Sequence, residues 1–337
     1  MIDQSRHVAL RPTPRASNEA SAAIDEIISD ALAKFDPERF WPAHPLDDVK
    51  DGHASVYMGA AGMIWALDYL SRVGATKIRF NFGPSLACLL EKTKTEMRDY
   101  DDYSDLGSLL FGDLGTALVI MRLSPSTAVA DVVELRARAN TRLPVRELMW
   151  GMPGSMLACI AMDELTGESR WRSIFEMQAE RLLGDLMTSE DGPIWVQDLY
   201  GKRQEFLGPV HGYAGNMIPL LRGWEWLSDA QRDLIANAVP RTLGANAWRS
   251  KIGTSWRATV GHDKPPGLCQ HCHGAPAMVT TFADAPFASA ELDGLLRDAG
   301  QFRWAAGPLA KGSNLWHRRQ RLCIPQAVSQ NGRRSLA

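Results

Sequence analysis

Several features that mark large classes of protein are missing from this sequence. Its 337 residues contain no uninterrupted apolar run of about eighteen residues, so no segment has the pattern of a membrane-spanning helix. The opening stretch, MIDQSRHVALRPTPRASNEA, has no apolar centre of the kind found in secretory signal peptides. We therefore expect a cytoplasmic protein that does not act at a membrane.

An excess of charge of either sign is also missing. The chain has 37 Lys and Arg against 39 Asp and Glu, which gives a net charge of −2. A balance this close provides no electrostatic basis for binding nucleic acid. The apolar fraction of 45% and the charged fraction of 23% are ordinary for a globular protein with a substantial core.

Cysteines are few, and their number is odd, which does not suggest a disulfide framework. Cys88 and Cys159 lie within apolar helical runs, so we interpret both as core residues. The stretch 269-CQHCH-273 has the C-x-x-C-H pattern of a c-type haem attachment site. The missing export signal weakens the haem interpretation. A fragment of a zinc site, or a turn that happens to hold two thiols, are the alternatives.

Strand patterns are scarce and helical patterns dominate. The best strand candidate is short, at 193–199. Residues 1–16 show no periodicity and are expected to be disordered, and Ser17 is a candidate cap for an amphipathic helix over 18–35. Another helix is predicted over 167–186, where Trp171, Ile174, Met177 and Leu182 recur at helical spacing. The sequence therefore predicts a mainly α fold.

A short motif recurs along the chain: a glycine, two residues, a second glycine and then an apolar helical run. The copies are 57–70, 110–123, 149–162 and 210–223, and a fifth at 272–285 has Ala277 in place of the second glycine. Paired glycines let the backbone turn tightly at a helix start. A helix that is apolar nearly all round is enclosed by others. The repeats predict an inner ring of helices inside an outer ring; the alternative is an irregular bundle with coincidental glycines.

The motifs SVYMGAAG, LFGDLG, ELMWGMPG, GPVHGYAG and CHGAP, in this order, resemble those of the lanthionine synthetase C (LanC) and LanC-like family over about residues 50 to 315. The resemblance implies an α/α toroid, the double ring of helices also called six-hairpin glycosidase-like, which we assign to 17–315. It also implies a zinc-dependent enzyme that adds a cysteine thiol to a dehydroamino acid in a peptide, giving a thioether. Family members without such a precursor peptide are associated with addition of glutathione.

Site residues follow from the resemblance at matching positions. Cys272, directly before His-Gly, corresponds to the first zinc ligand, and His211 of GPVHGYAG to the acid/base histidine. His273, next to Cys272, is expected at the same opening of the toroid as His211. The chemistry is consistent, because zinc deprotonates a bound thiol and the enolate formed by addition needs a nearby acid. Cys269 has no role in this interpretation, and the C-x-x-C-H pattern is then accidental.

Other candidates are weaker. Asp113 lies in a first helical turn, where the helix dipole favours a carboxylate, so we predict a structural role. Arg146 and Glu147 precede a repeat, and they either line the pocket or lie on a solvated face. His53 and His262 are isolated, and we assign them no role.

The resemblance ends after residue 315. Segment 307–315 resembles the lead-in to the family's second zinc motif, Cys-His-Gly, but Trp316 replaces the cysteine and Arg318 the glycine, so that His317 alone is kept. We expect 316–337 to be an aberrant basic tail, arising from a frameshift or a natural truncation, which leaves the toroid incomplete at its C-terminus. A reading frame shifted by one base can restore a glycine turn and an apolar helix. We therefore predict impaired zinc binding and little activity.

Two further functions are considered. A non-catalytic toroid module would bind a peptide or glutathione without zinc. A toroid glycosidase would need a pair of carboxylates at a defined separation across its pocket, and the sequence offers no convincing pair.

Overall fold

The structure is a computed structural model, and it describes residues 17–43, 52–98, 107–199, 202–261, 265–266 and 269–306. The chain is mainly α, as predicted. Of the described residues, those up to 143 together with 149–174 form an N-terminal unit, and 144–148 together with those from 175 onward form a C-terminal unit. The predictions for 1–16, His262, His317 and the tail 316–337 lie outside the described residues.

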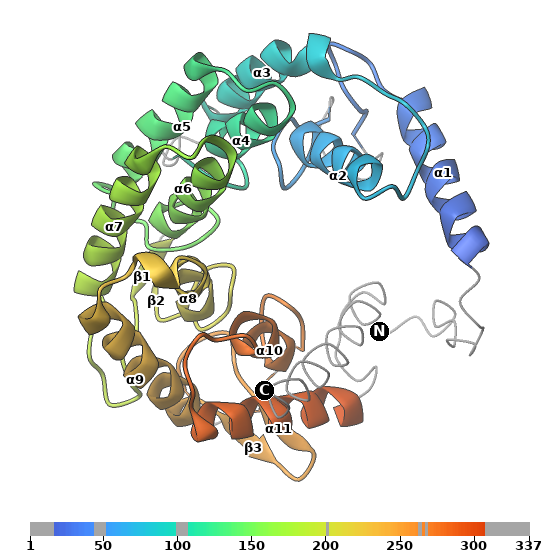
Figure 1. Cartoon of the computed structure of the whole chain (residues 1–337). Helices are drawn as coiled ribbons and strands as arrows, with labels where there is room; N and C mark the ends of the chain where they lie inside the picture. The colour runs from blue at the N-terminus through green and yellow to red at the C-terminus, as the bar shows by residue number, and fades with distance from the viewer. Residues whose placement is uncertain are drawn as a thin grey trace. The chain divides into compact units, whose positions relative to one another are not determined.

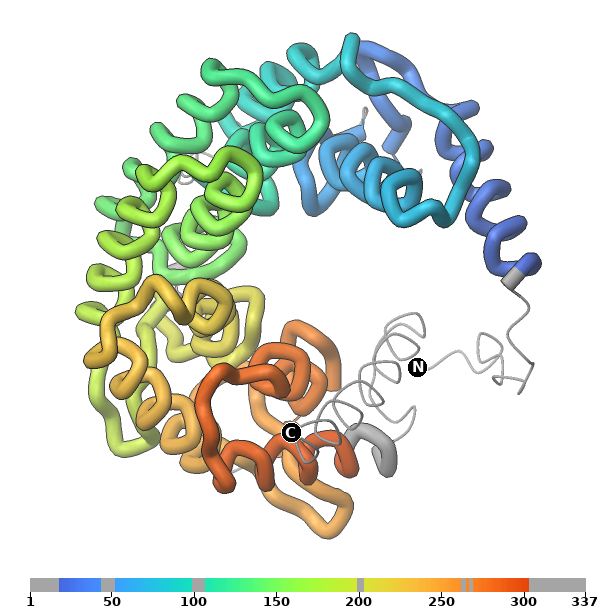
Figure 2. The backbone as a smooth tube through the Cα atoms, in the orientation of Figure 1, coloured from blue at the N-terminus to red at the C-terminus, as the bar shows by residue number. Residues whose placement is uncertain are grey.

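The N-terminal unit is helical (Figure 1). Within it α4 packs against α5 and α6, and α3 packs against α4 (Figure 2). Its elements are α1 (Ser17–Ala33), α2 (Ala60–Arg72), the 3-10 turn η2 (Gly83–Ser85), α3 (Leu86–Arg98), α4 (Asp113–Leu123), α5 (Thr127–Asn140) and α6 (Met152–Thr166). Helix α7 (Ser169–Gly184) begins in this unit and ends in the other.

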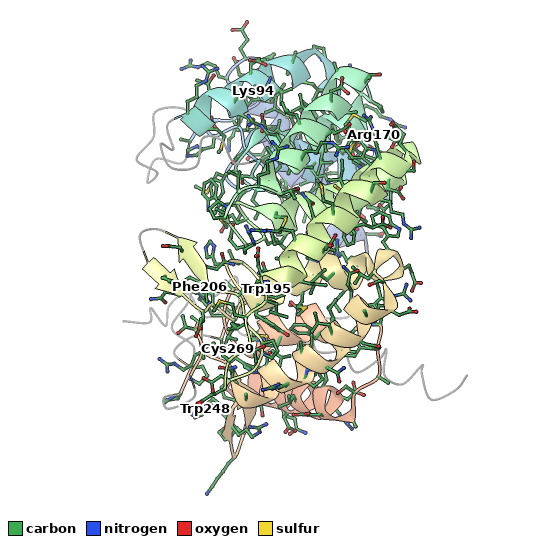
Figure 3. The ribbon with its side chains drawn as sticks, turned by 90° about the vertical axis from the view of Figure 1, so that its left-hand side faces the viewer. Lys94, Arg170, Trp195, Phe206, Trp248 and Cys269 are labelled. Carbon is green, nitrogen blue, oxygen red and sulfur yellow. The ribbon has the colours of Figure 1, made fainter. Side chains whose placement is uncertain are left out.

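The C-terminal unit adds two small antiparallel hairpins to its helices. Helix α10 packs against α8 and α11, and α11 packs against α9 and β4. Its elements are β1 (Gln197–Leu199), β2 (Lys202–Gln204), α8 (Tyr213–Arg222), η3 (Trp224–Trp226), α9 (Asp229–Ala245), β3 (Trp248–Ser250), β4 (Gly253–Ser255), α10 (Ala275–Phe282) and α11 (Ala290–Ala306). Trp195, labelled in Figure 3, and Trp256 are fully buried in its core. Each indole N–H donates to a helix carbonyl at 2.8 Å.

The five repeats predicted from the sequence are confirmed. Helices α2, α4, α6, α8 and α10 each begin at the residue after the first glycine of a motif. The close approach is clear at Gly212, where an added Cβ would lie 2.2 Å from the Phe206 carbonyl oxygen. A side chain at this position would force the loop away from the helix start.

Helix α2 departs from the prediction that each repeat helix is enclosed all round. Ala61, Ile64 and Leu67 are buried, whereas Trp65 and Tyr69 are each 47% exposed. The two exposed rings stack on each other with centroids 6.0 Å apart. The apolar composition of α2 therefore serves one buried face and one exposed aromatic face.

Three local predictions need correction. The strand predicted over 193–199 is reduced to β1, because β2 pairs only with 197–199, while Ile194 makes an isolated antiparallel bridge with Met187. Met177 lies on α7 as predicted, but it is exposed. Cys159 is a core residue, whereas Cys88 is exposed because Leu86 and Leu89 take the buried face of α3.

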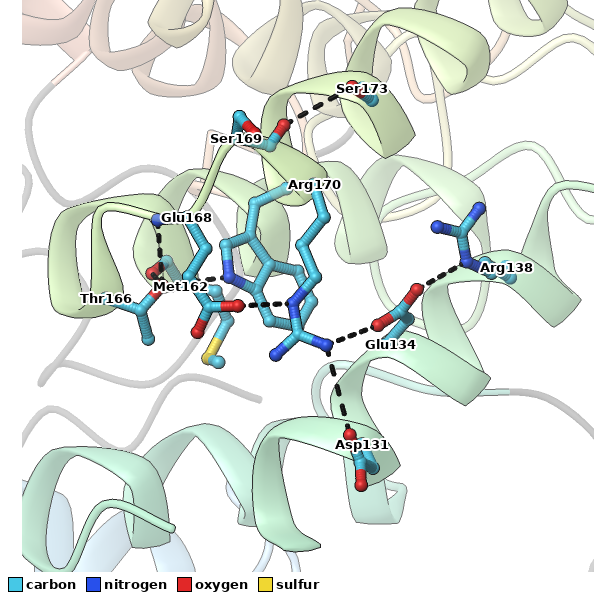
Figure 4. Close-up of polar contacts among 10 residues, drawn as sticks. Asp131, Glu134, Arg138, Met162, Thr166, Glu168, Ser169, Arg170 and Ser173 are labelled. Carbon is cyan, nitrogen blue, oxygen red and sulfur yellow. Dashed lines mark hydrogen bonds and ion pairs between the residues drawn. The ribbon is translucent and has the colours of Figure 1, made fainter. Parts of the chain in front are cut away.

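Arg170 of α7 is the centre of an ion-pair network in the N-terminal unit (Figure 4). It lies 2.6 Å from Glu134 on α5 and 2.7 Å from Glu168, and its guanidinium stands 4.6 Å from the Trp171 ring centroid. These contacts join the start of α7 to α5. None of the described helices is both long and apolar enough to cross a lipid bilayer.

Candidate functional site

His211 lies at the end of a loop that folds back onto the start of α8. The amide N–H groups of Tyr213 and Ala214 donate to the carbonyls of Phe206 and Leu207, at 2.9 and 3.0 Å. These bonds satisfy two of the amides that a helix start leaves without partners. They hold the loop from Phe206 to His211 against α8, and so they place the His211 ring beside the helix end.

Glu147 lies directly against His211. Its Oε2 is 2.9 Å from His211 Nδ1, and the Glu147 side chain is 0% exposed while that of His211 is 23% exposed. A buried carboxylate is costly unless it is hydrogen-bonded or paired. The pair therefore has the arrangement of an oriented acid/base histidine, with an orienting carboxylate behind it and a partly open ring in front.

Arg146, the neighbour of Glu147, is also buried. Its guanidinium Nε pairs with Asp185 Oδ2, and its side chain is 9% exposed. The solvated-face alternative for Arg146 and Glu147 is therefore wrong. The other alternative, in which these residues line the pocket, agrees with the contact between Glu147 and His211.

Cys272 lies at the tip of a tight turn. Gln270 and His273 exchange both backbone hydrogen bonds, at 2.8 and 3.2 Å, which leaves His271 and Cys272 as the two tip residues. Cys272 Sγ is half-buried and donates to Gln270 Oε1 at 3.4 Å. Burial raises the pKa of the Cys272 thiol above its ordinary value, so without a metal it is held as the neutral thiol.

The two loops meet at Gly208. A Cβ added there would lie 2.0 Å from the Cys272 carbonyl oxygen and 3.4 Å from His273 Nδ1. Burial lowers the pKa of His273, and the electrostatic effect of the neighbouring His211 lowers it further. His273 Nδ1 is buried and has no hydrogen-bond partner among the described residues.

Three of the four site residues predicted from the sequence thus come together in the C-terminal unit: His211, Cys272 and His273. His317, the fourth, lies outside the described residues. Among the residues that the structure describes, no three His, Cys, Asp or Glu side chains gather closely enough to hold a metal ion. Of the zinc ligands that the resemblance implies, Cys272 lies among the described residues, and its thiolate is a soft ligand of the type that suits zinc. Cys269, for which no role was predicted, is buried and precedes the turn (Figure 3).

Asp113 has the structural role predicted for it. It is buried on α4 and accepts hydrogen bonds from Arg136 Nε on α5 at 2.9 and 3.0 Å. His53 lies 3.9 Å from Glu96, whose carboxylate accepts from the Ala54 amide N–H. Both groups belong to the N-terminal unit.

No family model matches the chain, and no curated protein matches it. The chain is similar to a solved structure, that of nisin cyclase. The TM-score is 0.53 at 14% identity, and the alignment covers 89% of this chain and 76% of nisin cyclase. A likeness at this identity shows the fold alone, and that fold is the predicted LanC-like α/α toroid.

Proposed function

We propose that this protein belongs to the LanC-like thiol-addition catalysts, joining a thiol to a dehydroamino acid in a peptide. The proposal is carried by the Glu147–His211 pair, whose histidine lies on the loop that touches the Cys272 turn. The thiol substrate is either a cysteine of the same peptide or glutathione. The cytoplasm fits this chemistry, because its thiols are kept reduced.

The reaction needs a proton to leave the thiol and another to arrive on carbon. Sulfur bonds to the β-carbon of the dehydroamino acid, the double-bond electrons move to form an enolate, and the α-carbon then takes a proton. His211, oriented by Glu147, is suited to move this proton, and His273 lies within electrostatic reach of it.

Zinc, when bound, would make the substrate thiol a thiolate at neutral pH. Cys272 would be one ligand, and His317 is the candidate for another. Catalytic zinc sites use three protein ligands and leave one position open. Because Trp316 stands where the resemblance calls for a cysteine, we propose that zinc binding and activity in this chain are impaired.

A second function is favoured by Trp316, which takes the place of a cysteine that the resemblance implies as a zinc ligand. The alternative is a toroid that binds a peptide or glutathione without catalysis. It predicts binding of either ligand by calorimetry that is unchanged by a zinc chelator.

The proposal is tested with two matched proteins, the native chain and a Trp316→Cys/Arg318→Gly variant that restores Cys-His-Gly. Each is incubated with a dehydroalanine peptide and glutathione, and the mass increase of the peptide is followed over time. Metal content is measured by mass spectrometry of the elements. We expect zinc-dependent addition in the variant and little in the native chain. If neither protein exceeds a His211→Asn control, thiol addition is rejected.

The proposed impairment of zinc binding is tested separately. Native protein that carries one tightly bound zinc per chain would contradict it. Resequencing the gene across the codons for Ser313 to Gln320 decides its origin, because an inserted or missing base would show that the natural chain has Cys-His-Gly.

A further inference from the structure

Both polar groups of the Arg146 backbone are held by buried side-chain amides. Gln197 Oε1 accepts from the Arg146 N–H at 3.2 Å, and Asn216 Nδ2 donates to the Arg146 carbonyl at 2.8 Å. Gln197 is 1% exposed and Asn216 is 0% exposed. The two amides come from different elements, β1 and α8, so the backbone at Arg146 is tied to both.

The contact of Asn216 is directly coupled to the site. Helix α8 begins two residues after His211, and Asn216 lies in its first turns. Two consecutive residues are therefore held at the start of α8. Asn216 donates to the Arg146 carbonyl, and His211, just before the helix, pairs with Glu147. Any shift of the Arg146 backbone relative to α8 would move Glu147 relative to the His211 ring.

Each amide satisfies one backbone group of Arg146 but leaves one of its own polar atoms unpaired. Gln197 Nε2 and Asn216 Oδ1 are buried and have no hydrogen-bond partner among the described residues. A buried polar atom without a partner costs free energy. Two amides that each use only one of their two polar atoms are explained by a need to place the backbone between them.

We propose that Asn216 and Gln197 are positioning residues, which fix the Arg146 backbone and so hold the Glu147 carboxylate against His211. Neither side chain touches the reacting atoms. The catalytic consequence rests on the proposed function, whereas the placement of Glu147 against His211 does not.

The test compares Asn216→Ala with Asn246→Ala. Asn246 is a matched control, because it is 0% exposed in the same unit and donates to the carbonyls of Asp191 and Thr242 at 2.8 and 2.9 Å. Both variants are expected to lower Tm. The deciding readout is the NMR signal of the His211 ring nitrogens and protons, assigned by its loss in His211→Asn. We expect it to move in Asn216→Ala and to stay in place in Asn246→Ala.

Gln197→Met is the second variant, and it removes the bond to the Arg146 N–H while keeping the side-chain length. It is expected to move the same His211 signal, and it keeps the proposal testable if Asn216→Ala does not fold. Unchanged His211 signals in the folded variants overturn the proposal, as would equal movement in Asn246→Ala.

Activity gives an independent readout wherever the native chain or the Trp316→Cys/Arg318→Gly chain is active. Misplacement of the acid/base pair should lower kcat by roughly 10- to 100-fold with KM little changed. An active protein whose kcat is unaffected by both variants overturns the catalytic part. If neither chain is active, the proposed function has failed. The NMR comparison still decides whether Asn216 and Gln197 hold Glu147 against His211.

Discussion

Glu147 Oε2 lies 2.9 Å from Nδ1 of His211, although the two residues are 64 positions apart in the chain. A carboxylate at this distance favours the tautomer in which Nδ1 carries the hydrogen. The ring is thereby held in one orientation, which leaves Nε2 as the atom for the proton transfer that the proposed function requires. In that proposal the roles divide as in a histidine oriented by aspartate in a hydrolase triad.

Replacing His211 by asparagine should remove proton transfer. We expect thiol addition to fall by roughly 10²- to 10⁴-fold, the usual contribution of a general acid or base. Glu147→Gln should cause a smaller fall, because glutamine can still hydrogen-bond Nδ1 but carries no charge. Rates are measured by peptide mass in whichever of the native and Trp316→Cys/Arg318→Gly chains is active.

The matched control is Glu164→Gln, which neutralises an exposed carboxylate on α6. It should leave the rate unchanged. A His211→Asn protein that is folded and retains the native rate would remove His211 from the mechanism.

Alkylation by iodoacetamide should distinguish the cysteines in metal-free protein. Only the thiolate reacts, and the raised pKa of Cys272 makes its thiolate fraction at pH 7 to 8 smaller than that of an ordinary thiol. Its labelling should therefore be slow there and should continue to increase at higher pH than labelling of a model thiol. Cys159, whose pKa burial raises to about 12, should stay unlabelled throughout. Peptide mapping by mass spectrometry reads each cysteine separately.

The exposed Cys88 provides the comparison within the same protein, because its labelling is not limited by burial. Labelling of Cys272 as fast as that of Cys88 at pH 7 would show that the turn is more open than the structure has it.

The repeat helices could be predicted from the sequence because their cause is local. At Gly59 and Gly212 a loop carbonyl, of His53 and Phe206 respectively, comes close to the helix start, and the apolar run that follows each motif is visible in the sequence. The spacing of Leu86 and Leu89 could also have predicted that Cys88 lies on the exposed face of α3. The length of the short strand could not be predicted, because it depends on where the neighbouring segments pair: β2 pairs with 197–199 only, and Ile194 bridges to Met187.

The site was predicted only where a motif marked it. His211, Cys272 and His273 each lie at or beside the first glycine of a repeat, whereas Glu147 and Asn216 are recognised by their contacts with distant residues. The one signal for Glu147 was its place just before a repeat, and that signal did not separate a pocket from a solvated face. Burial and pairing, which depend on the tertiary structure, made the distinction.

Removing the charge of Asp113 should reduce stability and leave the chemistry intact. Asp113→Asn leaves Arg136, whose side chain is 26% exposed, without its buried carboxylate, and we expect a loss of about 2–3 kcal/mol of unfolding free energy. Asp30→Asn, at an exposed pair with Lys34, should change it by about 0.5 kcal/mol or less. Urea unfolding measures both. A fall in kcat of Asp113→Asn without loss of stability would contradict the structural role.

Gly208→Ala should separate the two loops of the site. The new Cβ would lie 2.0 Å from the Cys272 carbonyl oxygen, which is backbone and cannot rotate away, so one loop must move. We expect a loss of roughly 1–3 kcal/mol, as for other overpacked positions, together with faster alkylation of Cys272 as the turn is displaced. Gly294→Ala on α11 is the control: nothing lies within 4 Å of its new Cβ, and alanine should stabilise the helix by about 0.5–1 kcal/mol. Native stability and native Cys272 labelling in Gly208→Ala would show that the loops do not meet at Gly208, and the placement of His211 beside the Cys272 turn would then have to be abandoned.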